Sequence, residues 1–280
     1  MTGKDDLLDG GRPSTEPLYS KGNRDDYPLT EGYDLVKYAN LIKSHVTNSD
    51  KMLISQTICE EIFSGIFGWH KIYKSKAASW CKKSSYDDLV EHVKRKWKDG
   101  RNIFSLEVDD ETGSYYVYMV NGYGNGQTIV KQLSKIRDKW DDGRKITSCT
   151  SKGSTYYIVM TGKVDRFHSK SQTYFTRSSW SDVESKINKH YEYGKIITSI
   201  CYNQGLEEYL VVMTKSSDGQ RYKWTTSSSK RSKWMDEMYE DEDYHPTIVF
   251  KDPNDDNILV VMTSDEHRSG YTACWDVLLK

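Results

Sequence analysis

Apolar and polar positions follow two rhythms along this chain, and the two rhythms come in a fixed order. Within Ser181–Trp224, apolar residues first recur at helical spacing, a glycine follows, and three short runs of β-forming residues come last. Apolar residues at every third or fourth position predict one face of a helix, and short apolar runs bounded by turn residues predict strands. The same order precedes and follows this stretch, so we expect a repeat protein.

Three recurring anchors define the repeat. The first is an aromatic residue closing each predicted helix, followed by glycine, a base and isoleucine. The second is an apolar strand that ends in methionine, and the third is an aromatic strand leading to a tryptophan. Met119, Met160, Met213 and Met262 are 41, 53 and 49 residues apart, spacings in the range of one propeller blade per repeat. The first anchor occupies Trp97–Ile103, Trp140–Ile146 and Tyr191–Ile197.

Capping and turn residues set the limits of the predicted elements. A helix is expected over Ser85–Gly100, because serine caps the first turn and glycine readily takes the left-handed conformation at the end. A later helix is expected to open with the capping box Ser181–Glu184. The predicted strands are Met52–Cys59, Phe67–Lys74, Asn102–Val108, Tyr115–Val120, Gln127–Gln132, Lys145–Thr150, Tyr156–Thr161, Gln172–Thr176, Ile196–Tyr202, Glu208–Thr214, Gln220–Thr225, Thr247–Phe250, Asn257–Thr263 and Gly270–Val277.

These elements predict a β-rich α+β fold. We expect tandem units of one helix and three antiparallel strands, arranged as a propeller-like or curved array. Residues 1–30 are polar and are interpreted as an N-terminal arm that is disordered or docked on a partner. Residues 31–80 are expected to form a degenerate first repeat that caps the array, and residues 81–280 the regular repeats.

Composition narrows the class of protein. The 40 basic and 41 acidic residues nearly balance, which argues against a nucleic-acid-binding module and against an anionic membrane surface. The five cysteines are scattered and never form C-x-x-C, so neither a disulfide framework nor a zinc site is expected. The sequence has no signal-peptide pattern and no apolar run long enough to span a bilayer. We therefore expect an intracellular protein, cytoplasmic or nuclear, and no membrane partner.

No catalytic set emerges from the motifs. The glycine-rich run Gly122–Gly126 lies between two predicted strands and lacks the spacing of a phosphate-binding loop, so we interpret it as a hairpin turn. The seven histidines show no metal-ligand spacing, and Asp241–Asp243 lacks the order of a calcium loop. A Ser-His-Asp triad stays open, because such triads assemble in space. We expect no cofactor, no metal and no enzymatic activity.

The candidate binding residues come from the repeated positions. One interpretation of Arg101, Arg144 and Lys195 is that each base merely follows a helix C-terminus, where its charge complements the helix dipole. The other is that the repeats bring the three bases to one rim, which binds an acidic or phosphorylated protein partner. Three tryptophans at equivalent places of the repeats are expected to pack between units, or to form interface hot spots where exposed. They are Trp80, Trp180 and Trp234.

The anchors resemble a known family. The pattern W-x-D-G-[RK]-x-I-[TF]-S, at Trp97–Ser105, Trp140–Ser148 and in the variant Tyr191–Ser199, together with the methionine strands, is similar to the C-terminal repeat domain of plant-type casein-kinase-one-like protein kinases. The resemblance covers roughly residues 80 to 265. The chain has no Gly-rich kinase loop, H-R-D catalytic loop or D-F-G motif, so kinase activity does not carry over. The resemblance implies an accessory module for targeting or interaction.

The sequence thus predicts a non-catalytic intracellular scaffold or protein-recognition module within a larger assembly. The first alternative is an enzyme with a pocket at the centre of the repeats. A compact polar pocket in which two or more titratable groups converge would favour that alternative. A nucleic-acid-binding module is a third interpretation, against which the balanced charge counts.

Overall fold

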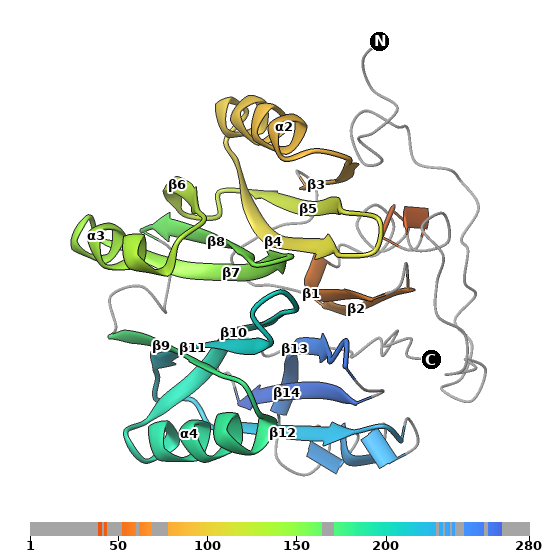
Figure 1. The fold of residues 1–280 in the computed structure, drawn as a ribbon, viewed down its shortest axis with the longest axis vertical. Helices are drawn as coiled ribbons and strands as arrows, with labels where there is room; N and C mark the ends of the chain where they lie inside the picture. Colours follow the sequence, from red (N-terminus) through yellow and green to blue (C-terminus); the bar gives the residue numbers. More distant parts are fainter. Residues whose placement is uncertain are drawn as a thin grey trace.

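A ring of β-sheets, with helices on its outside, forms the body of the protein in the computed structural model (Figure 1). The structure describes residues 39–40, 42–43, 52–59, 62–68, 78–163, 171–227, 230–231, 233–235, 237–238, 244–254 and 257–264. The N-terminal arm predicted over residues 1–30 and the strand predicted over Gly270–Val277 lie outside these residues.

Antiparallel pairing arranges the described strands in one two-stranded and four three-stranded sheets, which confirms the predicted fold class. The two-stranded sheet joins β1 (Met52–Cys59) to β2 (Ile62–Gly68), so the strand expected at Phe67–Lys74 begins earlier, at Ile62. The other sheets contain, in spatial order, β3 (Ala78–Lys83), β5 (Ser114–Asn121) and β4 (Arg101–Asp109); β6 (Asn125–Val130), β8 (Thr155–Gly162) and β7 (Arg144–Lys152); β9 (Gln172–Arg177), β11 (Glu208–Lys215) and β10 (Lys195–Asn203); β12 (Gln220–Thr225), β14 (Ile258–Ser264) and β13 (Tyr244–Lys251).

Each sheet is a blade of the ring, numbered 1 to 5 in chain order. In a three-stranded blade the chain enters through the outer strand, passes through a helix, and then forms the inner and middle strands. The helices of blades 2, 3 and 4 are α2 (Tyr86–Lys98), the short pair η3 (Leu133–Lys135) and α3 (Ile136–Asp141), and α4 (Trp180–Glu192). The predicted units are therefore out of phase with the blades, because the third strand after each helix pairs within the next sheet.

The glycine-rich run Gly122–Gly126 shows this change of sheet. It joins β5 to β6, and these strands pair in different sheets, so the predicted hairpin is wrong. Gly122, Gly124 and Gly126 have φ angles of 75°, 59° and 56°. Three left-handed residues in close succession turn the chain out of one sheet and into the next, a path that glycine takes without steric cost.

Serine caps open the two long helices. Ser85 accepts a hydrogen bond from the Asp88 amide at 3.1 Å, which confirms the predicted cap of α2. Helix α4 is capped by Ser179, whose hydroxyl accepts from the Asp182 amide at 3.2 Å, and not by Ser181. Asp182 in turn accepts from the Ser179 hydroxyl at 2.7 Å, and the cap lies two residues earlier than predicted. Within the described residues, no helix is long and apolar enough to cross a membrane.

The inner strands β1, β4, β7, β10 and β13 lie side by side around a central axis (Figure 1). Each contacts the next, and β13 contacts β1, so the described inner strands form a closed circuit. All five carry a register shift at the same place, as between Ile146 and Ser148 in β7. Such bulges bend a strand and increase its twist. The middle strands are almost wholly buried, which explains their unbroken apolar runs.

Three of these bulges are each held by a glutamine from the next blade. Gln172 on β9 accepts from the Ile146 amide at 2.8 Å and the Trp140 indole at 3.1 Å. Its Nε2 donates to the Ile146 carbonyl at 3.0 Å and to the Thr214 hydroxyl at 3.1 Å. Gln127 and Gln220 make the same set of four contacts one blade before and one blade after.

Hydroxyl groups join neighbouring inner strands further along. Ser148 and Thr150 of β7 accept hydrogen bonds from amides of β4, each at 3.2 Å. Ser55 and Thr57 of β1 accept in the same way from β13, at 3.1 and 3.2 Å. These side chains point along the circuit from one blade to the preceding one, and they space the inner strands around the axis.

Candidate functional site

The three bases predicted to form a rim share one position on three neighbouring inner strands. Arg101, Arg144 and Lys195 are the first residues of β4, β7 and β10. Arg144 donates to a backbone carbonyl and pairs with Asp142 at 2.9 Å. Burial, and then the neighbouring Lys215 ammonium, lowers the pKa of Lys195. The structure thus places the three bases at the same end of the ring, and a partner at this end stays a prediction.

The three predicted tryptophans do not occupy equivalent positions. Trp80 lies in β3, is fully buried and donates to the Gln56 side chain at 3.2 Å. Trp180 opens α4 and stacks on Trp224, with centroids 4.0 Å apart. Trp234 lies in the short helical segment 233–235. The burial of Trp80 favours the packing interpretation for that residue. By register, the residues that match Trp80 in the other three-stranded blades are Ile129, Tyr174 and Tyr222.

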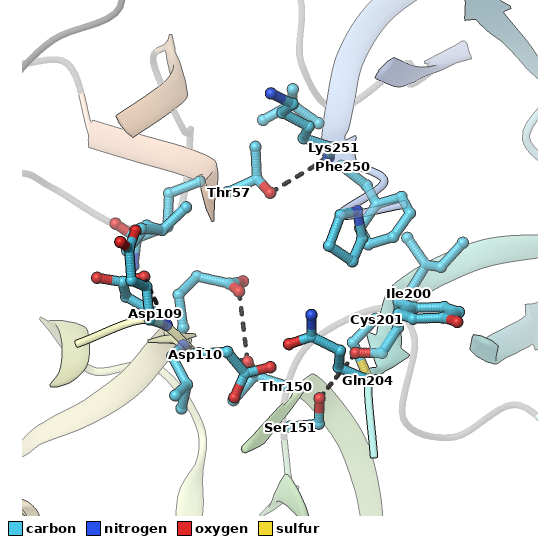
Figure 2. Close-up of a pocket in the computed structure, with 18 residues that line it drawn as sticks. Thr57, Asp109, Asp110, Thr150, Ser151, Ile200, Cys201, Gln204, Phe250 and Lys251 are labelled. Carbon is cyan, nitrogen blue, oxygen red and sulfur yellow. Dashed lines mark hydrogen bonds between the residues drawn. The ribbon is translucent and has the colours of Figure 1, made fainter. Parts of the chain in front are cut away.

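The opposite ends of the inner strands enclose a cavity of about 490 Å³ (Figure 2). This end of the ring carries the hairpins that join each inner strand to its middle strand. All five blades contribute to the wall, so the cavity depends on the complete circuit. The lining residues are Gln56, Thr57, Ile58, Glu107, Val108, Asp109, Asp110, Glu111, Thr150, Ser151, Ile200, Cys201, Tyr202, Gln204, Val249, Phe250, Lys251 and Pro253.

Among the carboxyl groups of the wall, Glu107 lies farthest along β4 from the hairpin. It lies within β4, two residues before the strand ends, and it is half-buried. Thr150 Oγ1 donates to Glu107 Oε2 at 3.5 Å (Figure 2), the far limit of hydrogen-bond distance. Burial, and then the neighbouring Cys149 thiol, raises the pKa of Glu107 well above its ordinary value. No described lysine or arginine forms an ion pair with this carboxyl.

The other carboxylates of the cavity lie where β4 turns into β5. The Asp109 carboxylate stabilises this turn, since it accepts hydrogen bonds from the Glu111 amide at 3.3 Å and from the Thr112 hydroxyl. Asp110 accepts from the Gly153 amide of the next hairpin at 3.2 Å, and burial raises its pKa. Glu111 is exposed at the mouth. The acidic side of the cavity therefore runs from a half-buried carboxyl to an exposed one.

The facing wall is largely apolar. Figure 2 shows Ile200 and Phe250 across the cavity from Asp109 and Asp110. Val249 and Phe250 are buried, and Ile58 and Pro253 complete this side. Lys251 is the only lysine or arginine among the lining residues. A carboxylate side opposite an apolar side suits a ligand that carries a cation on an apolar stem.

A thiol also borders the cavity. Cys201 lines it, and Cys149 lies beside it with its Sγ 3.1 Å from the Ser199 hydroxyl. Burial, and then a hydrogen bond with Cys149, raises the pKa of Cys201 well above its ordinary value. Because the thiolate is the reactive form of cysteine, this environment does not activate Cys201 as a nucleophile. No group of described His, Cys, Asp and Glu residues is arranged to hold a metal ion.

The sequence predicted a central pocket only as part of the enzyme alternative, and Glu107 was missed. Its signal was a single charged residue inside a predicted strand, at a position where the other inner strands carry Thr57, Thr150, Cys201 and Phe250. That signal gains meaning only when five strands are known to meet at one axis. The carboxylates at the end of β4 looked like an ordinary polar turn.

No family model matches this chain, and no curated protein matches it either.

Proposed function

We propose that this protein is a non-catalytic recognition module, which binds a protein partner at the hairpin end of its ring. The observation that carries the proposal is the central cavity, because it is walled by all five blades and lined by carboxyl groups on one side. A ligand bound there contacts every blade, so its binding depends on the assembled ring. The proposed role as part of a larger assembly follows from this way of binding.

Charge at this end of the ring favours a basic partner segment. Carboxylates outnumber lysines in the described hairpins, and such an imbalance attracts cationic segments and speeds their association. This partner chemistry differs from that of an acidic segment bound at the first residues of the inner strands, so the two ends of the ring make separable predictions. The charged residues of the described hairpins are Asp109, Asp110, Glu111, Lys152, Glu207, Glu208, Lys251 and Asp252.

The test is affinity purification of the tagged full chain from its native cells beside two charge-reversed variants. One variant carries Glu111→Lys and Glu207→Lys, two exposed residues at the hairpin end. The matched control reverses the other end with Arg101→Glu, Arg144→Glu and Lys195→Glu, and both variants are first checked for folding.

We expect a stoichiometric partner that the control retains and the hairpin variant loses. The opposite pattern would move the interface to the basic rim. Absence of any stoichiometric partner would sink the recognition proposal.

A second candidate function is enzymatic, and one observation favours it. Glu107 is a half-buried carboxyl group with a raised pKa, which is the state that general acid catalysis uses near neutral pH. The same burial also arises at purely structural carboxyls, and Cys201 beside it is held as a thiol. A turnover found by substrate screening and abolished by Glu107→Gln, in a folded variant, would establish the enzyme and replace the recognition module.

A further inference from the structure

We infer that the central cavity binds the side-chain ammonium group of a lysine residue, presented by the partner, and that Glu107 is its counter-ion. The inference rests on the proposed function and specifies the chemistry that the ring recognises.

The first argument is that the Glu107 carboxyl has unused capacity to accept hydrogen bonds. Glu107 receives one hydrogen bond among the described residues, from Thr150 at 3.5 Å, and no described base pairs with it. A carboxylate enclosed in protein is costly unless a cation or several donors accompany it. An incoming ammonium supplies both charge and donors, so it converts the least favourable group of the wall into a desolvated ion pair.

The second argument is an unused donor in the same wall. Gln56 is 2% exposed and lines the cavity. Its Oε1 accepts from the Trp80 indole, whereas its Nε2 has no hydrogen-bond partner. A lysine residue of a chain brings both kinds of group, because its ammonium donates and its backbone carbonyl accepts. A free polyamine offers ammonium donors alone.

Ammonium fits better than guanidinium because of Thr150. The threonine hydroxyl lies 3.5 Å from Oε2 of Glu107, so Oε1 is the oxygen without a partner among the described residues. Guanidinium gains its advantage from bidentate pairing with both oxygens, whereas ammonium acts as a compact point charge on a flexible stem. The apolar wall of Val249 and Phe250 offers that stem a surface to cover.

The experiment uses isothermal titration calorimetry at pH 7.5 to titrate the full-length protein with a short peptide that contains one lysine and is otherwise uncharged. Parallel titrations use the same peptide with Nε-acetyllysine, the same peptide with arginine, and spermidine. The variant is Glu107→Gln, which keeps the shape of the side chain and removes its charge. The control is Glu91→Gln, an exposed position on α2 remote from the cavity.

We expect saturable binding of the lysine peptide, weakened at least tenfold by Glu107→Gln and unchanged within about threefold in the control. The acetylated peptide should bind at least tenfold more weakly, because it lacks the charge. Equal binding of the acetylated peptide, or of the Glu107→Gln variant, would overturn the inference. Tighter binding of the arginine peptide than of the lysine peptide would overturn the choice of ammonium. Binding of spermidine without binding of the lysine peptide would overturn the inference that the ammonium belongs to a protein partner.

Proton release gives a readout that a merely structural role of Glu107 does not move. If the uncomplexed carboxyl carries a proton, binding of an ammonium expels it, and the measured heat then depends on the ionisation enthalpy of the buffer. This dependence should vanish in Glu107→Gln, and its persistence there would assign the proton to another group. The other titratable residues that line the cavity are Asp109, Asp110, Glu111, Cys201, Tyr202 and Lys251.

The two proposals fail separately. A cellular partner that is retained by Glu107→Gln, with no binding of the lysine peptide, would keep the recognition module and reject the lysine site. Specific binding of the peptide without any cellular partner would do the reverse.

Discussion

Replacing Gln172 by leucine is expected to destabilise the protein through the bulge of the preceding blade. Gln172 satisfies both backbone groups of Ile146, at 2.8 and 3.0 Å. Ile146 is 2% exposed, so water does not replace the lost partners. Leucine fills the space of glutamine without offering either a donor or an acceptor.

The magnitude follows from the groups left behind. Each buried backbone group without a partner costs about 1–3 kcal/mol, and two such groups remain at Ile146. The Trp140 indole is only half-buried and can reach water. The Thr214 hydroxyl keeps Thr198 at 3.1 Å. We therefore expect the free energy of unfolding to fall by about 2–6 kcal/mol, a large part of the stability of an ordinary domain.

Urea denaturation, monitored by tryptophan fluorescence, measures this loss. The control is Gln132→Leu, an exposed glutamine whose side chain makes no capping bond, and we expect its effect to stay within about 0.5 kcal/mol. Amide hydrogen exchange should also accelerate at Ile146 in the Gln172 variant. A loss below about 1 kcal/mol with normal exchange at Ile146 would refute the reasoning, because two buried groups cannot be orphaned so cheaply.

Three further predictions concern single side chains. Burial raises the pKa of Glu107 well above 4.5, so the folded state holds its proton longer than the unfolded state, and stability falls as pH rises from about 4.5 through the folded pKa. Glu107→Gln should therefore be more stable than the parent at pH 8, by about 1.4 kcal/mol for each pH unit between the two pKa values. Denaturation at pH 8 and pH 4 tests this, and a pH-independent difference would contradict it. Gly205→Ala should lower the melting temperature more than Gly143→Ala. A Cβ at Gly205 would lie 2.5 Å from the backbone of the neighbouring hairpin, whereas a Cβ at Gly143, at φ +77°, meets open space and costs only the left-handed strain of about 1–2 kcal/mol. The reverse order would be inconsistent with the packing of the hairpins. Ser179→Ala should lower the free energy of unfolding by about 1 kcal/mol in chemical denaturation, and Ser181→Ala should leave it almost unchanged. Equal losses in the two variants would contradict the assignment of Ser179 as the cap of α4.

Local chemistry made the elements predictable. Gly100, Gly143 and Gly194 stop the helices with φ angles of 77°, 77° and 64°, as the recurring glycines indicated. The cap of α4 was harder, because Ser179 and Ser181 each precede an acidic residue by three positions. Apolar periodicity does not separate two caps that lie two residues apart.

The pairing of strands that lie far apart in the sequence could not be predicted from local patterns. The pattern of β6 predicts a strand, but nothing within it says that its partner is β8 rather than β5, because both candidates are apolar strands. The cavity depends on the strand pairing of all five blades. Glu107, a charged residue in a strand, becomes a candidate site only when inner strands from all five blades surround it.

The glutamine contacts also set an order of events during synthesis. Gln127, Gln172 and Gln220 each hold a bulge that lies earlier in the chain, by 24, 26 and 23 residues measured to the isoleucine they bind. Because domains begin to fold as the chain emerges, the bulge of one blade waits for the outer strand of the next. A nascent chain that pauses between two blades therefore exposes its last inner strand with unsatisfied backbone groups. The newest blade is always the one that aggregation or a chaperone would reach first.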